Sequence, residues 1–381
     1  MQDLLGRAFR ANPAYELALW DRLAPGERRA LERLRDDPDF YGILRPREAA
    51  AGLGVKSVDR ETALLFLTLR EPGGLPSYVR AVLGEAAGRT VARLVADGIL
   101  EIEKDGAFVS GPAAFAERRE GGVGEGRLAR LSVAALRYGQ ALAVDDPLRL
   151  SFRLYGYNRR PLTPRWLRLL QSPEAVRDWL GIGPRGANRP ALDRAWKASS
   201  PSEFWLSWRS RLEETASSPD GTTWKLYVSP APEALPESFG AILEALGAAR
   251  AGQFKIGAGA AGLLRPDKIV AYFPSFDRLA EAAGAVQARL GGVPAQGVPF
   301  TSEIGGDGLL SWGMDPPVSK GAWGGRESWR LWLTHRLARA LLAARGAADG
   351  LEPWRFALER LRLEGIDTET WTPAAGLWSE G

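Results

Sequence analysis

Three of the seven lysines fall within apolar segments, and these residues are the best suited to chemistry. Lys225, Lys255 and Lys268 lie in WKLYV, FKIG and DKIVAYF, which read as strands. Such a lysine faces either solvent or a cleft, because burial of an unpaired ammonium is costly. With Arg265 nearby, the three could line an anion site, where crowding lowers a lysine pKa and creates a general base. A solvated sheet face is the alternative.

Two other motifs carry polar or aromatic groups that could bind a ligand. In LYGYNRRPLTPRW, Arg159 and Arg160 could grip a carboxylate or phosphate, or they could simply be solvated. A cluster of tryptophans near a glycine-rich loop could stack on an aromatic ligand or belong to the core. The cluster comprises Trp312, Trp323, Trp329 and Trp332. The single histidine, His335, lies in LWLTHRLARALL, and we expect a structural role for it.

Composition excludes several kinds of site. The chain has no cysteine and one histidine, which excludes disulfides, iron–sulfur clusters, thiol nucleophiles and multi-histidine metal sites. Gly257, Gly259 and Gly262 form a G-x-G-x-x-G pattern after an expected strand. Pro266 and another strand-like run follow at once, so there is no room for the long helix of a dinucleotide fold. We therefore expect no cofactor and no metal.

Length and charge indicate a multidomain protein without a membrane segment. At 381 residues the chain exceeds the size at which one core stops growing. Its net charge of +4, spread over 96 charged residues, does not by itself indicate nucleic-acid binding. It has neither an apolar run near ~18 residues nor a secretory h-region at its start. We expect a cytoplasmic bacterial protein.

The order of patterns predicts an α+β multidomain fold. Residues 1–116 begin with a helix over 14–38 and continue with three helices and a hairpin around Asp105-Gly106, the order of a winged helix. Asp59 is the expected N-cap of the first of those three helices. Residues 117–127 read as a linker. Residues 128–216 read as a helical middle region, and 217–381 as an α/β sandwich-like domain with a mixed sheet. The middle region includes a strand-like run at 148–155 and a helical face at 204–212.

The expected winged helix is poorly suited to DNA. Its third helix balances Arg89 and Arg93 against Glu85 and Asp97, and the wing EIEKDG is acidic. Residues 40–105, from YGILRPREA through VKSVDRETALLFLTLREPG to VARLVADGILEIE, resemble the PqqD-like recognition domain of peptide natural-product pathways. That resemblance implies a domain that accepts a precursor leader as an added strand. The groove would be lined by Val55, Val58, Val91, Leu94 and Val95, residues that could equally form the domain's core.

Residues 222–375 resemble the HopA-type effector domain, whose relatives include phosphothreonine and phosphoserine lyases of some lanthipeptide pathways. The order FKIG…RPDKIVAYF…AQGVPFT…DGLLSWGMDPP…ESWRLW carries the resemblance. It implies Lys255 as the base that removes an α-proton, with basic residues holding phosphate and Arg265 with Asp267 at an R-x-D step. Thr301, Asp315-Pro316 and Glu327-Ser328-Trp329 match further positions. The family's histidine after the Ser-aromatic pair is missing, since Arg330-Leu331-Trp332 stands there, so the acid for the leaving group is unidentified.

These observations leave three functional hypotheses. The first is a protein of ribosomal peptide maturation that binds a precursor peptide or its product, with or without catalysis. The second is an active phosphothreonine or phosphoserine lyase that forms dehydroamino acids. The third is a DNA-binding, ligand-sensing regulator. The expected partner is a peptide, not nucleic acid or a membrane. The sequence also allows a homodimer.

Overall fold

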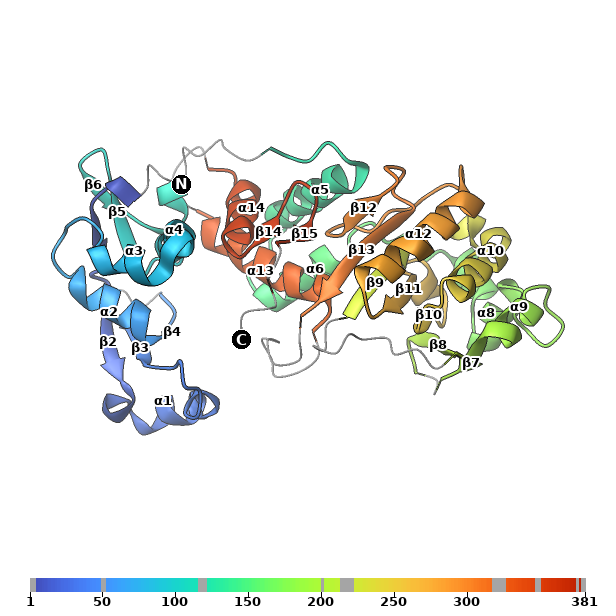
Figure 1. The fold of residues 1–381 in the computed structure, drawn as a ribbon, viewed down its shortest axis with the longest axis horizontal. Coiled ribbons are helices and arrows are strands. Elements are labelled where there is room, and N and C mark those ends of the chain that lie inside the picture. Colours follow the sequence, from blue (N-terminus) through green and yellow to red (C-terminus); the bar gives the residue numbers. More distant parts are fainter. Residues whose placement is uncertain are drawn as a thin grey trace. The chain divides into compact units, whose positions relative to one another are not determined.

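The computed structural model describes residues 5–48, 53–115, 122–199, 202–212, 223–316, 327–346, 351–374 and 377. The chain divides into two compact units (Figure 1). Unit 1 comprises Met1–Arg119 and Ala343–Phe356, and unit 2 comprises Glu120–Leu342 and Ala357–Gly381. The predicted boundary near 116 lies close to the first division. The predicted middle region does not form a unit of its own, because it folds together with the C-terminal part.

The described residues of unit 1 form two small antiparallel sheets and four complete α-helices, and the unit also includes the end of α13 and the start of α14. One sheet has the order β1-β5-β6 and the other the order β2-β3-β4. The elements are β1 (Phe9–Ala11), β2 (Tyr15–Leu19), α1 (Pro25–Ala30), β3 (Gly42–Pro46), β4 (Lys56–Val58), α2 (Arg60–Thr68), α3 (Ser77–Leu83), α4 (Ala87–Ala96), β5 (Leu100–Lys104) and β6 (Ala107–Val109). Short 3-10 helices cover Trp20–Arg22, Glu32–Leu34, Gly84–Ala86 and Gly111–Phe115.

The predicted succession of three helices and a hairpin is present in α2, α3, α4, β5 and β6. Asp59 caps α2 as predicted, with its carboxylate accepting a hydrogen bond from the Thr62 amide at 2.7 Å. The hairpin turn has positive φ at both Asp105 and Gly106, as a two-residue turn between antiparallel strands requires. The apolar face of α4 and the inner residues of β1 and β5 are buried together.

The predicted helix over 14–38 is wrong. Residues 15–19 instead form β2, in which Leu17 lies opposite Leu44 of β3. Ala18, Leu23 and Ile43 then form a small core against Trp20 and other partly buried residues. Helical spacing of leucines is a weak signal, and pairing with a neighbouring strand overrides it. Pro25 also fixes the start of the short helix α1.

Unit 2 is built on one seven-stranded sheet with the order β12-β13-β9-β11-β10-β8-β7. Its strands are β7 (Trp196–Ala198), β8 (Trp205–Ser210), β9 (Thr223–Val228), β10 (Gln253–Gly257), β11 (Ile269–Phe273), β12 (Ser302–Ile304) and β13 (Leu310–Asp315), with a separate pair β14 (Ile366–Asp367) and β15 (Thr372–Pro373). Its helices are α5 (Arg127–Ala141), α6 (Pro147–Tyr155), α7 (Pro164–Leu169), α8 (Pro173–Trp179), α9 (Arg189–Ala195), α10 (Leu235–Ala248), α11 (Ala260–Leu263), α12 (Phe276–Leu290), α13 (Trp329–Ala344) and α14 (Pro353–Leu363), the last two crossing the unit division. A 3-10 helix covers Pro232–Ala234.

The seven-stranded sheet has two unlike faces. One face is apolar and packs with α10 and α12 into the large core of unit 2, through Phe254, Ile256 and Ala271 among others (Figure 1). The other face carries polar side chains, including Lys225 and Lys255. The alternation of these side chains along each strand is what separates the two faces. Every strand pair described in this sheet is antiparallel, so the predicted mixed sheet is corrected to an antiparallel one.

In two segments of the predicted middle region, helix and strand are exchanged relative to the prediction. Residues 205–210 form strand β8, whereas we predicted a helical face over 204–212. Residues 147–155 form helix α6, whereas the run at 148–155 reads as a strand. Asp146 caps that helix through the Arg149 amide and Pro147 occupies its first turn, and these two signals outweigh the local apolar run. No helix in the described part of the chain is long and apolar enough to cross a membrane.

Candidate functional site

The predicted lysines lie on the same face of the seven-stranded sheet. Lys255 of β10 lies opposite Val270 of β11, and Tyr272 of the same strand lies opposite Lys225 of β9. Residues two apart share a face, so Lys225, Lys255 and Tyr272 all point to the polar side. Lys268 continues the register, since its carbonyl accepts the Gly257 amide at 3.1 Å. Lys268 therefore starts from the same face.

Lys225, Lys255 and Arg265 form a row of cations separated by aromatic rings, which we call the cation row. The Lys225 and Lys255 ammonium nitrogens lie 5.3 and 5.6 Å from the centroid of the Tyr272 ring. Lys255 Nζ also lies 4.2 Å from the Trp205 ring, and the Arg265 guanidinium lies 5.2 Å from that ring. The rings stabilise the cations through their negative faces without neutralising them. Carboxylates balance the charge at the two ends of the row, since Asp315 pairs with Lys225 and Asp267 pairs with Arg265.

Lys255 is the titratable group of the row. Burial, followed by the positive charge of Lys225, lowers the pKa of its ammonium to about 8. Arg265 lowers the pKa further, while Asp267 and Asp315 oppose the shift. A partly buried amine with this pKa is neutral in a substantial fraction of molecules near neutral pH, which is what a general base requires.

Lys225 is held at the row by a carboxylate that also fixes a helix. Asp315, at the end of β13, forms a buried ion pair with Lys225. Its other oxygen accepts the Trp329 amide at 2.8 Å, at the start of α13. A carboxylate at a helix N-terminus is favoured by the unsatisfied amides there. Asp315 thus ties the sheet, Lys225 and α13 together.

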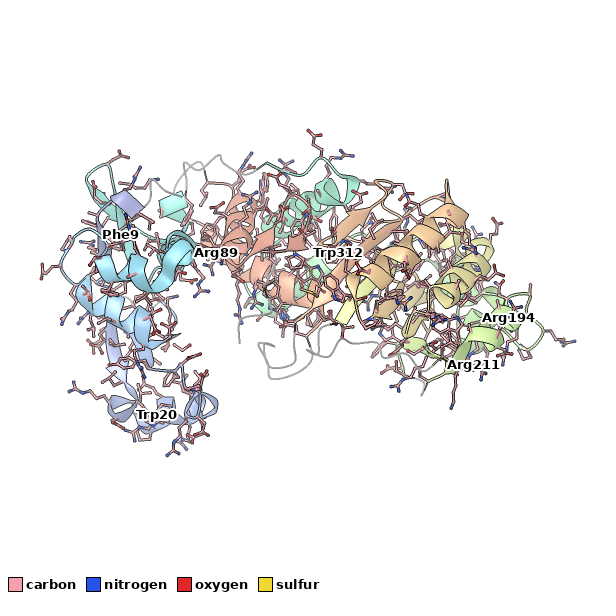
Figure 2. All side chains as sticks on the ribbon, viewed as in Figure 1. Phe9, Trp20, Arg89, Arg194, Arg211 and Trp312 are labelled. Atoms are coloured by element: carbon pink, nitrogen blue, oxygen red, sulfur yellow. The ribbon has the colours of Figure 1, made fainter. Side chains whose placement is uncertain are left out.

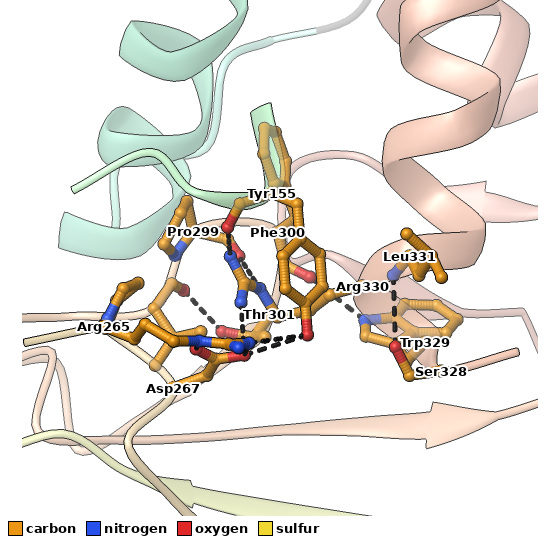
Figure 3. Close-up of polar contacts among 12 residues, drawn as sticks. Tyr155, Arg265, Asp267, Pro299, Phe300, Thr301, Ser328, Trp329, Arg330 and Leu331 are labelled. Atoms are coloured by element: carbon orange, nitrogen blue, oxygen red, sulfur yellow. Dashed lines mark hydrogen bonds and ion pairs between the residues drawn. The ribbon is translucent and has the colours of Figure 1, made fainter. Parts of the chain in front are cut away.

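A second carboxylate, Asp267, organises the other end of the row (Figure 3). Arg265 donates to it in a fork, with Nε and Nη2 at 2.8 and 2.7 Å from the two oxygens. Arg330 of α13 lies 2.8 Å from the same carboxylate, and the Tyr155 hydroxyl donates to it at 3.0 Å. These two arginines and their hydrogen bonds hold the pKa of Asp267 well below its usual range despite burial. Asp267 is therefore ionised and fixes Arg265 in place.

The loop after α6 brings one further cation to this end. Asn158 adopts φ 66° and donates from Nδ2 to the Gln296 and Gly297 carbonyls, at 2.8 and 3.0 Å. This anchoring places Arg159 near Arg265, with its side chain still open to solvent. Partial burial of the guanidinium, followed by the positive charge of Arg265, lowers the pKa of Arg159. Arg160 is exposed, and its backbone amide donates to the Leu264 carbonyl at 2.9 Å.

Lys268 does not belong to the cation row. Its side chain is fully buried, and its ammonium donates to the Pro230 carbonyl at 2.9 Å and to Gln296 Oε1 at 2.7 Å. Burial lowers the pKa of Lys268 to about 7. Because it is enclosed by loop carbonyls, Lys268 can fix these loops but cannot meet a substrate.

The predicted aromatic and apolar ligand contacts are corrected by the structure. Trp329 and Trp332 are buried and stack on each other with ring centroids 6.1 Å apart. Trp312 lies on the opposite face of the sheet, against Trp224 and Phe276. Trp329 and Trp332 therefore pack the interior and offer no surface to a ligand, whereas Trp312 is partly buried against the core of unit 2. Trp323 lies outside the described residues.

The apolar groove predicted in unit 1 is largely core. Val58, Val91, Leu94 and Val95 are buried, because they face inward from β4 and α4. Val55 alone of the predicted set is exposed, at 53%, just before the edge strand β4.

His335 pairs with Glu327, whose Oε1 lies 2.5 Å from Nδ1 of the imidazole. This contact joins the first turns of α13 to a residue two positions before the helix.

Three residues at this site are not among those predicted from the sequence. Trp205 falls within the predicted helical face, although residues 206–209 (Leu-Ser-Trp-Arg) alternate apolar and polar as a strand does. Tyr272 was treated as part of an apolar strand. Arg330 read only as a departure from a family pattern, yet its side chain is 1% exposed and pairs with Asp267. An arginine amid the apolar residues of a helix was the available signal, because burial of a guanidinium requires a partner.

The described residues hold no group of three or more acidic or histidine side chains arranged to bind a metal. The glycine pattern at 257–262 leads into α11, a helix of four residues. Gly257 and Gly262 are in close contact, since a Cβ on Gly257 would lie 2.4 Å from the Gly262 carbonyl carbon. These glycines allow two backbone segments to meet.

No protein-family model and no curated protein matches the chain. Solved structures do match it. An effector protein from Pseudomonas syringae pv. tomato strain DC3000 is 13% identical with a TM-score of 0.39, and the match covers 65% of this chain and 97% of that one. An effector from Pseudomonas syringae pv. syringae strain 61 is 12% identical (TM-score 0.37; 65% and 98% covered). The phosphothreonine lyase SpvC, the effector protein from Salmonella, is 13% identical (TM-score 0.28; 48% and 90% covered).

Proposed function

We propose that unit 2 eliminates phosphate from a phosphorylated threonine or serine residue of a peptide. The observation that carries the proposal is the Lys255 amine, whose pKa is lowered to about 8 inside a row of cations. A base beside fixed positive charges is what this elimination needs. The binding-only alternative loses its main support, because Trp329 and Trp332 are buried.

In the proposed step, neutral Lys255 takes the α-proton of the phosphorylated residue and becomes an ammonium. The electron pair of the Cα–H bond forms the Cα=Cβ double bond. The Cβ–O bond breaks, and its electron pair leaves with the phosphate. The products are a dehydroamino acid residue and inorganic phosphate, and loss of the proton to water restores the neutral amine.

The cation row also bears on the leaving group, for which the sequence identifies no general acid. A phosphate monoester has its second pKa near ~6, so at neutral pH the group departs with a high negative charge that the site must stabilise. Water, which receives the proton from Lys255, supplies the proton that the departing phosphate takes up. Arg265 meets Asp267 through Nε and Nη2, and among the described residues Nη1 has no partner. Nη1 and the exposed Arg159 could therefore hold the leaving phosphate. The resemblance to a family with a histidine nearby then does not require a histidine here.

We further propose that the substrate is the precursor of a ribosomally made peptide and that unit 1 holds it. The resemblance of residues 40–105 to leader-recognition domains supports this role. β4 lies at the edge of its sheet in the described structure, next to the exposed Val55. An edge strand offers backbone groups that an extended peptide can pair with.

Mass spectrometry of a degenerate library of phosphothreonine and phosphoserine peptides tests the elimination. Incubation with the full-length protein should convert substrates to products lighter by one phosphoric acid, the mark of a dehydro residue. Simple hydrolysis would instead leave the hydroxyl residue, which is heavier than the dehydro product by one water. Inorganic phosphate released in solution should equal the dehydro product in amount.

Two lysine variants complete the test. Lys255→Ala should abolish turnover while leaving peptide affinity nearly unchanged, because affinity is supplied by other residues. Lys104→Ala, in the hairpin of unit 1, is the matched control and should keep full activity. Unchanged turnover in Lys255→Ala, or the absence of any dehydro product with the wild-type protein, would overturn the proposal.

A further inference from the structure

A basic pocket lies at the β7 edge of the same sheet, outside the cation row. It has a volume of about 530 Å³ and is lined by residues of β7, β8 and β10 together with Ser199. The lining residues are Lys197, Ala198, Ser199, Ser207, Arg209 and Gln253. The three strands run side by side at this end of the sheet (Figure 1).

The strand register connects this pocket to Lys255. Ser207 lies directly opposite Lys255, and Gln253 is two residues before Lys255 on β10. Arg209 lies opposite Gln253, and Lys197 lies opposite Arg209. All of these side chains therefore share the face of the cation row. With strands ~4.8 Å apart and ~3.4 Å per residue, the Cα atoms of Arg209 and Lys197 lie about 8 and 12 Å from that of Lys255.

The charge of the pocket has one sign. Its two ionisable lining residues are Lys197 and Arg209, and no carboxylate lines it. Both side chains are exposed, and within the described segments neither forms an ion pair. The serines and Gln253 supply neutral hydrogen-bonding groups. Such a pocket complements an anionic group of modest size.

We propose that this pocket binds an anionic side chain of the substrate peptide and so selects the sequence around the reacting residue. This inference rests on the proposed function. An extended chain advances ~3.3 Å per residue, so the anionic group lies about two to four residues from the phosphorylated one. The shared chemistry is a carboxylate of Asp or Glu, or a second phosphate.

A positional scan of phosphothreonine peptides tests the pocket. Glutamate and, separately, glutamine are placed at each position up to four residues on either side of the phosphothreonine. We expect one position at which glutamate raises kcat/KM by about fivefold over glutamine, the range for exposed ion pairs. Phosphoserine at that position distinguishes the two sources when its binding to Lys255→Ala, which cannot turn it over, is compared with that of glutamate. A stronger gain identifies a phosphate subsite and an equal gain a carboxylate subsite.

Charge reversal then assigns the effect to the pocket. The double variant Lys197→Glu and Arg209→Glu should lose the preference for glutamate and prefer lysine at the same position. Arg194→Ala, an exposed arginine on α9 outside the pocket lining, is the control and should keep the wild-type preference (Figure 2). A wild-type preference for glutamate that survives the double reversal would overturn the inference.

A binding readout separates the pocket from the chemistry. Fluorescence anisotropy with Lys255→Ala measures affinity for the glutamate and glutamine peptides without turnover. If the glutamate peptides bind more tightly but the wild-type protein eliminates no phosphate, the proposed function is overturned and the proposed pocket is supported. If the glutamine peptides are turned over and glutamate is preferred at no position, the proposed role of the pocket is overturned and the proposed function is supported.

Discussion

At the scale of single residues, Lys255 and Lys268 show that a lowered pKa alone does not make a base. Burial lowers the pKa of both, to about 8 for Lys255 and about 7 for Lys268. Lys268 is 0% exposed, and its ammonium donates hydrogen bonds to Pro230 and Gln296. Lys255 is only partly buried and lies between two rings. Access, rather than pKa, distinguishes the two.

The pH dependence of elimination should follow the neutral amine of Lys255. Its pKa lies below the usual lysine value, so the neutral form increases as pH rises towards about 8 and saturates above it. We expect kcat/KM, which reports the free enzyme, to rise about tenfold per pH unit below this pKa and then level off. Lys225→Met removes a like charge that lowers the pKa, so its rising limb should move to higher pH. A profile that is flat from pH 7 to 9 would contradict the assignment.

At the scale of elements, α13 is positioned by one glycine and one carboxylate. Gly313 lies opposite Lys225, and the Trp329 ring packs directly onto it. Trp329 Nε1 donates to the Phe300 carbonyl at 3.1 Å, and Asp315 accepts the Trp329 amide. Arg330 follows on the same helix and reaches Asp267. The start of α13 therefore holds both ends of the cation row in register.

Gly313→Ala tests this contact. The added Cβ would lie 2.3 Å from Trp329 Cδ1, and the fully buried ring has no room to move. We expect a loss of about 1–3 kcal/mol in the free energy of unfolding, typical of overpacking. Gly284→Ala on α12 is the matched control, since nothing lies within 4 Å of its Cβ. It should be neutral or stabilise by about 0.5–1 kcal/mol. Urea unfolding of the wild type and both variants measures the effect. An unfolding midpoint of Gly313→Ala equal to that of Gly284→Ala would refute the contact.

The β4 edge makes a separate prediction about partners. We expect the full-length protein to select extended peptides from a displayed peptide library and to bind duplex DNA only weakly at low salt. Val55→Asp places a charge beside the edge and should weaken binding of the selected peptides. Val82→Asp, on α3 and also exposed, should not. Tight DNA binding with a steep salt dependence would instead support the regulator hypothesis.

At the scale of the whole molecule, the two units have their own cores. Buried residues of β1, α4 and β5 form the interior of unit 1, and the apolar face of the large sheet forms that of unit 2. Unit 1 also takes in a distant part of the sequence, since residues 343–356 belong to it. Units with separate cores can unfold separately.

Core truncations should therefore act on one unit at a time. Leu100→Ala in β5 and Leu246→Ala in α10 each remove a fully buried side chain. We expect each to destabilise its own unit by about 2–5 kcal/mol and to shift only one of two calorimetric transitions. A single transition shifted equally by both variants would show that the units unfold together.

The sequence by itself determined the features that depend on local chemistry. The Asp59 cap, the Asp105-Gly106 turn and the strands around Lys225 and Lys255 are all where local patterns predict them. The types of residue at the cation row were also evident, because lysine within an apolar strand requires an unusual environment.

The tertiary structure alone decided which of these residues meet. Strand order β9-β11-β10-β8 places the Tyr272 ring between Lys225 and Lys255, and the Trp205 ring between Lys255 and Arg265. That order depends on hydrogen bonds between segments distant in sequence, which periodicity does not encode. The same pairing turned residues 205–210 into a strand and buried Trp329, Trp332 and Lys268. Long-range pairing and packing outweigh local preference, because they bury far more apolar surface and satisfy more backbone groups.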